Sequence, residues 1–307
     1  MLVTEKEWYI EAPWGRICVV AWGSCADPPV LLCHGAVDSA ASWRPIMEHL
    51  PPTFYYIGME LPGNGKSDPL PRGLMLATHD LVYAIEVLRR HFRWEHFVYM
   101  AHSLGTALGK QYNLAYPGRM TKVVEFDPIP AYQTITPDQF GLWYHAYFTK
   151  YYQKYHIFNA PKETAPLYTR EKALSMLEKN RGLTGAAASM VLDRISEPVG
   201  NGLVRFTFDQ RTKQVVLPPY TSEHARKFFT EMKTPTLVII ASVSLKRGAY
   251  DKVPFALDEK CHPHNNYRVF HVEGRHDVHV MHPERMAKVV ERFLLYGVEG
   301  LDTKSKL

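Results

Sequence analysis

Apolar residues along this chain of 307 residues occur in two patterns, short continuous runs and helical spacing, and the two patterns alternate along the chain. Short continuous runs rich in β-forming residues are typical of buried strands in a mainly parallel sheet. Such runs stand at residues 17–22, 29–35, 54–59, 97–101, 123–127, 236–241 and 267–272, and a shorter run at 8–10 precedes the first. Helical spacing follows in between, as at 78–92 and 104–116, and a last helix is expected from Pro283. This rhythm predicts an α/β fold with a mostly parallel central sheet and helices on both faces.

Residues 131–230 lack this alternation and are rich in aromatic side chains. We interpret them as an inserted, mainly helical cap, which leaves residues 1–130 and 231–307 to form the core. Several of the aromatic residues recur at helical spacing: Tyr132, Trp143, Tyr144, Tyr147, Phe148, Tyr151, Tyr152 and Tyr155. For most of them we expect a role in sealing the cap onto the core rather than in contacting a substrate.

The apolar run at 97–101 leads into Ser103, and helix-forming sequence follows at once. This layout predicts a nucleophile elbow, in which a sharp turn from strand to helix exposes one serine hydroxyl. The turn strains the backbone, so the positions two before and two after the serine must be small. Ala101 and Gly105 occupy them. We therefore expect Ser103 to be a nucleophile.

A serine hydroxyl needs a base within hydrogen-bond reach, and a carboxylate that orients this base. His276 follows the last predicted strand on a loop that opens at the same edge of the sheet as the elbow. Asp251, on the loop after the strand at 236–241, and Asp127, after the strand at 123–127, are both placed to supply the carboxylate. Both give the chain order of serine, acid and histidine that this fold uses. Loop position favours Asp251 over Asp127.

Two backbone amides are expected to form the oxyanion hole of this site. One belongs to Leu104, directly after the serine, and the other to Ala36, directly after the pair His34-Gly35. We expect no metal and no cofactor. His276, His279 and His282 are evenly spaced, but no acid or cysteine completes them as a metal site.

Composition and charge exclude other classes of function. The net charge of +5 arises from 36 basic and 31 acidic residues that are not gathered into a basic arm, so nucleic-acid binding is not expected. No apolar run approaches the roughly 20 residues of a membrane-spanning helix. The first residues have no apolar core and carry acids, unlike a secretory signal.

The chain ends in Ser305-Lys306-Leu307, the tripeptide that the peroxisomal import receptor reads. The preceding residues are polar, as an accessible tag requires. We therefore expect the protein to be located in the peroxisome and to bind the import receptor. Any protein that is not imported is expected in the cytosol.

Several stretches together resemble the α/β-hydrolase family, and they cover nearly the whole chain outside the cap. The more general ones are His34-Gly35, Gly63-Asn64-Gly65-Lys66-Ser67, the elbow at 101–105, and Gly274-x-His276 with Pro283 beyond it. Three further stretches look closest to the serine hydrolase-like proteins, a group that includes the insect Kraken proteins: 12–17 with 21–23, 202–204 with 209–211, and 248–251. The resemblance implies an acid after the seventh sheet strand, where Asp251 stands. Alanine at position 101 departs from the usual glycine.

Two functions follow as hypotheses. The first is a serine hydrolase that cleaves an ester or thioester of a small apolar acyl substrate through Ser103, His276 and Asp251, with an acyl-enzyme intermediate. The second is a protein without catalytic activity that uses the same fold to bind a small molecule, since a fold does not guarantee an activity. Intact Ser103 and His276 favour the first.

Overall fold

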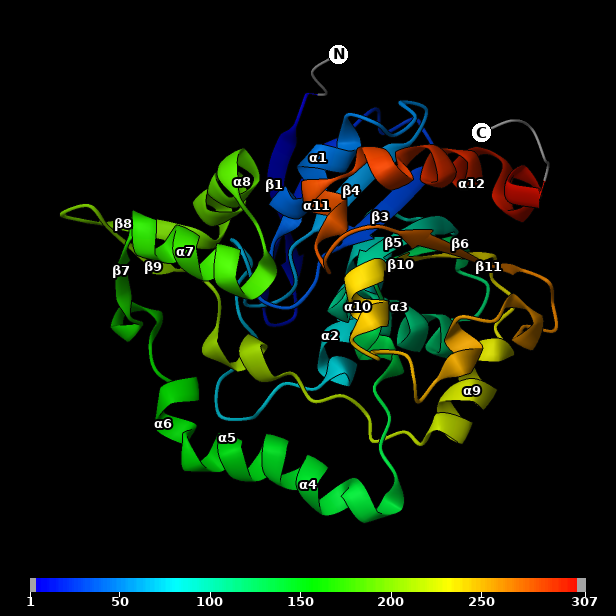
Figure 1. The fold of residues 1–307 in the computed structure, drawn as a ribbon. Coiled ribbons are helices and arrows are strands. Elements are labelled where there is room, and N and C mark those ends of the chain that lie inside the picture. Colours follow the sequence, from blue (N-terminus) through cyan, green and yellow to red (C-terminus); the bar gives the residue numbers. More distant parts are fainter. Residues whose placement is uncertain (1–3, 303–307) are drawn as a thin grey trace.

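The computed structural model describes residues 4–302, built around a central sheet of eight strands (Figure 1). The order across the sheet is β1-β2-β4-β3-β5-β6-β10-β11. β2 pairs antiparallel with both of its neighbours, and all the other pairs are parallel. The strands are β1 Lys6–Ala12, β2 Gly15–Trp22, β3 Pro29–Cys33, β4 Tyr55–Met59, β5 Phe97–His102, β6 Met120–Phe126, β10 Thr236–Ala241 and β11 Tyr267–Val272. The expected tripeptide Ser305-Lys306-Leu307 lies outside the described residues.

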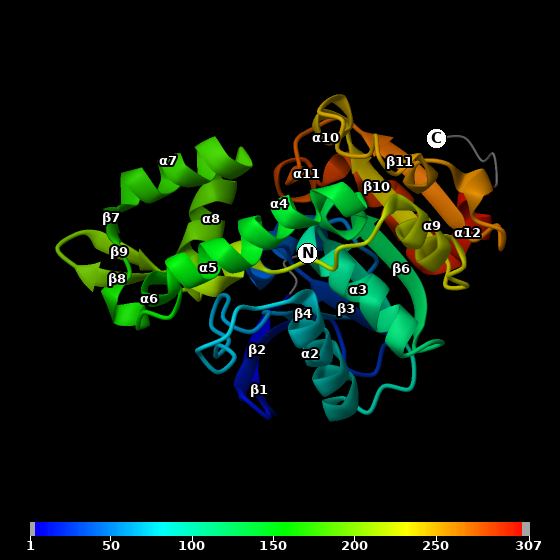
Figure 2. The same ribbon diagram turned by 90° about the horizontal axis from the view of Figure 1, so that it is seen from below.

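Helices cover both faces of this sheet because alternate strand residues point to opposite sides. One face packs on α2 and α3 through residues such as Leu81, Ile85 and Tyr112 (Figure 2). The other face packs on α1 and α12 through Met47 and Phe293. The helices of the core are α1 Arg44–Met47, α2 Thr78–His91, α3 Leu104–Ala115, α10 Ser242–Lys246, α11 Val278–Met281 and α12 Glu284–Asp302.

The predicted α/β fold class is therefore confirmed, and each predicted strand and helix of the core has its counterpart. The last helix bends at Gly297, where φ is 65°, a feature that its apolar stripe does not reveal. None of the helices in residues 4–302 combines the length and the apolar character that crossing a membrane requires.

Much of the chain between β6 and β10, including α7 and α8, lies beside the sheet, whereas α9 lies against the core (Figure 1). A small sheet in the order β7-β9-β8 packs with α7 and α8 around a second apolar cluster, which Val280 of the core also joins. The elements are α4 Phe140–Tyr144, α5 Lys150–Gln153, α6 Tyr155–Phe158, β7 Leu167–Thr169, α7 Arg170–Arg181, α8 Gly185–Ile195, β8 Ser196–Gly200, β9 Leu203–Phe206 and α9 Ser222–Thr230. Ala225 and Phe229 of α9 belong to the main core.

The aromatic residues of this region do not all seal it onto the core. Tyr132 and Tyr151 are buried, but Tyr144, Tyr152 and Tyr155 are each more than 40% exposed. The expectation concerned most of these residues, and these three are exceptions to it, whereas the other five are buried or partly buried. Their helical spacing predicted one shared face, but spacing does not show whether that face meets protein or solvent.

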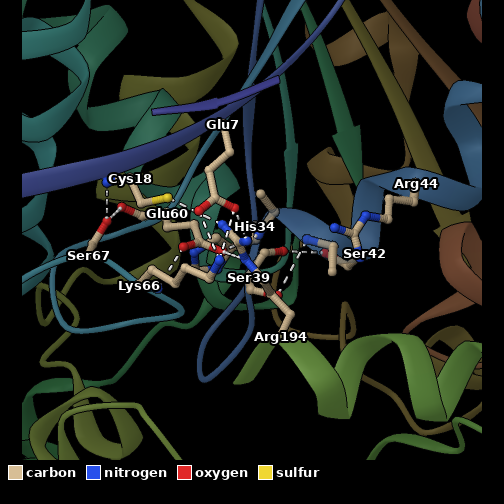
Figure 3. A network of polar contacts seen from close by, with 12 residues as sticks. Glu7, Cys18, His34, Ser39, Ser42, Arg44, Glu60, Lys66, Ser67 and Arg194 are labelled. Atoms are coloured by element: carbon tan, nitrogen blue, oxygen red, sulfur yellow. Dashed lines mark hydrogen bonds and ion pairs between the residues drawn. The ribbon is translucent and has the colours of Figure 1, made fainter. Parts of the chain in front are cut away.

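A buried ion pair joins the inserted elements to the core (Figure 3). Arg194 of α8 donates from Nε to Glu60 Oε1 over 2.7 Å, and from Nη1 to Glu7 of β1. Glu60 follows β4, is fully buried, and also accepts from the amides of Lys66 and Ala40. Removing one partner of such a pair leaves the other charge in a poorly solvated place.

We predict that Arg194→Ala lowers the free energy of unfolding by roughly 3 kcal/mol, because Glu60 then stays buried without its cation. Urea unfolding followed by circular dichroism measures this loss. The matched control is Arg170→Ala, which removes an ion pair to Asp193 whose side chains are 42% and 59% exposed and should change stability by less than about 1 kcal/mol. Equal losses in the two variants would contradict the prediction.

Candidate active site

Ser103 stands at the tip of the turn between β5 and α3. Its backbone has φ 51° and ψ −116°, outside the conformations that residues with a side chain usually adopt. Two interactions hold it there: its amide donates to the carbonyl of Phe126 in the neighbouring strand, and its carbonyl accepts from the Thr106 hydroxyl. The predicted elbow is present, with its serine on the sheet edge.

The small residues around the serine are required by close approach. A Cβ atom at Gly105 would lie 2.5 Å from the carbonyl oxygen of Cys33, a distance that real Cβ atoms do not reach. A Cβ at Gly35 would lie 3.0 Å from Cβ of Ser103. Ala101 is fully buried in the core, where its methyl group is accommodated. Position 105 therefore needs glycine, whereas position 101 does not.

His276 lies on the loop between β11 and α11, and its ring bridges two residues of the sheet edge. Nε2 lies 2.8 Å from Oγ of Ser103, and Nδ1 lies 2.6 Å from Oδ2 of Asp127. A carboxylate can only accept a hydrogen bond, so the proton of the neutral ring sits on Nδ1. Nε2 is then the acceptor for the serine hydroxyl.

Asp127 is the acid that meets this histidine. It follows β6 directly, has φ 44°, and is 1% exposed. Besides His276, its carboxylate accepts from the hydroxyls of Ser244 and Tyr250 and from the amide of Ala241. Four donors on one buried carboxylate stabilise its charged form and fix its orientation.

The preference for Asp251 over Asp127 is therefore wrong. The chain after β10 forms α10 and then a turn in which the Asp251 amide donates to Gly248. This turn folds the Asp251 carboxylate back over Gly248, and the side chain is exposed at a different cavity. Its neighbour Tyr250 is the residue that turns inward and reaches Asp127.

The loop after β3 is held next to the serine by His34. The Nδ1–H group of this buried ring donates to the carbonyl of Gly35 over 2.7 Å, and Nε2 accepts from the amide of Leu61 over 3.0 Å. Burial lowers the pKa of His34, so the ring stays neutral in this role. Ala36 lines the same cavity as Ser103, and Leu104 is the first residue of α3. The first amides of a helix have no partner within it.

A buried polar cluster lies behind His276. Arg181, the last residue of α7, donates to Asp38 over 2.9 Å and also to Asp277. Asp38, His102 and Asp277 each place one atom of a metal-ligating type within 4.8 Å of the others. Because Arg181 already supplies a cation to both carboxylates, the donor set fits a guanidinium better than a metal ion. The evenly spaced His276, His279 and His282 do not gather as a trio in the described structure.

His102 and one further histidine, His279, belong to this cluster, and both are buried. His102 donates from Nε2 to the backbone carbonyl of His276 over 3.1 Å, which supports the loop that carries the base. The ring of His279 lies 4.2 Å from that of His102, between centroids. Burial, reinforced by the neighbouring charges, holds the pKa of each well below the ordinary value of histidine.

Ser103 and His276 open into a cavity of about 460 Å³. Charged side chains line much of it, among them Arg181, Arg247 and Arg275. Ala249 also lines a neighbouring cavity of about 590 Å³, whose walls include Tyr132, Leu142, Trp143, Tyr147 and Leu217.

Sequence reasoning missed several residues of this site. Ser244 and Tyr250 hold Asp127. No motif marks Ser244, and Tyr250 lies in the stretch 248–251, in which the family resemblance points only to the acid. Arg181 comes from the inserted region, far along the chain from Asp277, and only the fold brings the two together. A buried carboxylate needs hydrogen-bond donors. The one signal in the sequence that could have pointed to Ser244 and Tyr250 is therefore that both carry hydroxyl groups and follow a strand at the same sheet edge as the candidate acids.

Comparison with known proteins identifies the class. Residues 28–247 match the family described as the alpha/beta hydrolase fold. The match spans more than half of the chain, so the protein belongs to this family.

One protein relative and two solved structures show which members of the family this chain resembles. The chain is 25% identical to serine hydrolase-like protein 2 of Homo sapiens over 95% of this chain and 94% of that protein. The hypothetical protein PA1622 from Pseudomonas aeruginosa PAO1 superposes with a TM-score of 0.76 at 21% identity, over 94% of this chain and 98% of that one. A thioesterase domain from the curacin biosynthetic pathway superposes with a TM-score of 0.72 at 15% identity, over 94% and 99%. The predicted resemblance to serine hydrolase-like proteins is confirmed, and the two structures support the fold.

We predict that His279 makes the protein sensitive to acid. In the unfolded chain a histidine titrates near its ordinary pKa of about 6.5, whereas burial lowers the pKa of His279 in the folded state. Below pH 6.5 the unfolded state therefore binds a proton that the folded state does not. Stability should fall by about 1.4 kcal/mol per pH unit for this one group as the pH drops.

Urea unfolding of His279→Leu and of the unchanged protein between pH 7.5 and 5.5 checks this. The variant should lose less stability over this range, while the exposed control His49→Asn should behave like the unchanged protein. If His279→Leu shows the same pH dependence as the unchanged protein, His279 does not titrate in this way.

Proposed function

We propose that this protein is a serine hydrolase that cleaves carboxylic esters or thioesters, with Ser103 as the nucleophile, His276 as the base and Asp127 as the orienting acid. The single observation that carries the proposal is the continuous chain of short hydrogen bonds from Oγ of Ser103 through His276 to the buried carboxylate of Asp127. Membership of the hydrolase family supports it.

The reaction follows from this geometry. Oγ of Ser103 forms a bond to the carbonyl carbon of the substrate while its proton passes to Nε2 of His276. The resulting oxyanion is stabilised by the amides of Ala36 and Leu104, each worth on the order of 3 kcal/mol in the transition state. Cleavage of the ester or thioester bond then releases the leaving group, which takes the proton from His276.

Water completes the cycle. His276 takes a proton from a water molecule, whose oxygen attacks the acyl carbon bound to Ser103. The bond between the acyl group and Oγ then breaks, the acid is released, and Oγ recovers its proton from Nε2. Asp127, held in place by its other donors, keeps the ring of His276 oriented, and its negative charge stabilises the charged imidazole that forms beside it.

The cavity beside the site supports an apolar acyl group. Trp143, Tyr147 and Leu217 line a space of about 590 Å³ next to the cavity of Ser103. An acyl chain placed there would exchange contact with water for contact with aromatic and aliphatic side chains. In this proposal the inserted elements act as the cap that encloses the acyl chain.

We predict that a fluorophosphonate probe labels the protein and that Ser103→Ala abolishes the labelling, because this reagent reacts with an activated serine. Gel fluorescence together with the mass of the modified peptide measures it. The control variant is Ser42→Ala, which removes a buried serine outside the cavity and should leave labelling intact. A folded protein that binds a small molecule but is not labelled would favour the alternative of a binding protein without catalytic activity.

We predict that Asp127→Asn lowers kcat for a short p-nitrophenyl ester by roughly 10³–10⁴-fold, because an amide no longer fixes the tautomer of His276 or stabilises its charge. Asp251→Asn, the matched control, should change kcat by less than about twofold, since its carboxylate is exposed and contacts neither Ser103 nor His276. Steady-state kinetics on both variants measures the difference. A large loss in Asp251→Asn alone would refute the role given to Asp127.

A further inference from the structure

The cavity that holds Ser103 is rich in positive charge. Its lining carries four cationic side chains, Lys179, Arg181, Arg247 and Arg275, against the two carboxylates of Asp38 and Asp277. Arg181 is paired with both of these carboxylates and is only 16% exposed. The other three cations are exposed, and none has an ion-pair partner among residues 4–302.

These three cations come from separate parts of the chain. Lys179 lies in the last turn of α7, in the inserted region. Arg247 ends α10, and Arg275 directly precedes His276. Charges that only keep a protein surface hydrated do not need to gather at one cavity from three separate segments of the chain. Like charges in a partly enclosed space repel one another, and a bound anion relieves that repulsion.

Arg275 is also held toward this cavity by its packing. It lies against Gly182, directly after α7, so closely that a Cβ at position 182 would come within 2.7 Å of its Nη1. Gly182 has φ 75°, a conformation that glycine adopts without strain. The end of α7 thus leaves room for the Arg275 side chain between the inserted region and His276.

We propose that the substrate of this enzyme carries an anionic oxygen group, a carboxylate or a phosphate, and that Lys179, Arg247 and Arg275 bind it. Guanidinium groups suit both anions because they donate two parallel hydrogen bonds. The apolar cavity takes the acyl chain, and the cations select among substrates by charge. This inference rests on the proposed hydrolase function where it concerns turnover.

The test compares two pairs of substrates whose members differ in charge, and the members of the first pair are also close in size. One pair is p-nitrophenyl butyrate and the p-nitrophenyl monoester of succinate, which places a carboxylate on the acyl side. The other pair is the butyryl thioester of N-acetylcysteamine and butyryl-coenzyme A, which places phosphates on the leaving group. In at least one pair the anionic member should have a kcat/KM roughly tenfold higher or more, and added NaCl should reduce this ratio. The pair that responds identifies the source of the anion.

Variants then assign the residues. Arg247→Gln and Arg275→Gln should each lower the ratio of anionic to neutral kcat/KM by roughly tenfold, the loss expected for one charged hydrogen bond. Lys179→Gln should lower it less, since lysine binds as a single point charge. The matched control is Lys246→Gln, a neighbouring exposed cation that does not line the cavity and should leave the ratio unchanged.

Binding measured without turnover separates this inference from the proposed function. Calorimetric titration of the Ser103→Ala protein with coenzyme A and with glutarate should detect binding of one of them, weakened by Arg275→Gln. That result supports the anion site even in a protein that no fluorophosphonate labels. A labelled enzyme that treats both members of each pair alike, and whose Ser103→Ala form binds neither titrant, would overturn the anion site while the hydrolase proposal stands.

Discussion

The conformation of Ser103 is the constraint on which the rest of the site depends. A positive φ at a residue with a side chain is costly, and the surrounding structure must hold it in place. Here the neighbouring strand accepts the Ser103 amide, and the carbonyl of Cys33 lies so close that only glycine fits at position 105. The order of β3, β5 and β6 in the sheet creates these contacts. The same order brings the loop of His34 and the end of β6 to either side of the serine.

Burial decides the roles of the other polar residues. Asp127 is tolerated in the interior because four donors replace the water it has lost. Burial keeps His34 and His102 neutral. Through hydrogen bonds, His34 holds the loop after β3 and His102 holds the loop of His276. His276 is partly exposed at the cavity in which a substrate would lie, whereas His102, which also lines this cavity, is buried.

The inserted region contributes charged residues to the cavity. Its α7 sends Arg181 to Asp38 and Asp277, while the Arg194 pair of α8 ties the region to β1 and to the residue after β4. These contacts hold the end of α7, with Lys179, at the cavity, where Arg247 and Arg275 of the core supply the other cations that lack an ion-pair partner within residues 4–302. In the proposed anion site, substrate preference depends on Lys179, Arg247 and Arg275. The family match ends at residue 247, so it does not include Arg275.

The sequence by itself determined the fold class, the limits of most core elements, and the placing of Ser103 and His276 at one edge of the sheet. Those features depend on local periodicity and on short motifs, which a single stretch of chain contains whole. It favoured the wrong acid, Asp251, over Asp127, because both follow strands that end at the same sheet edge and local sequence does not show which carboxylate turns inward. Only the tertiary structure decided this, since the turn at Gly248 folds Asp251 away while hydroxyls from Ser244 and Tyr250 converge on Asp127. The charged cavity also joins residues far apart in the chain, and no local pattern carries such contacts.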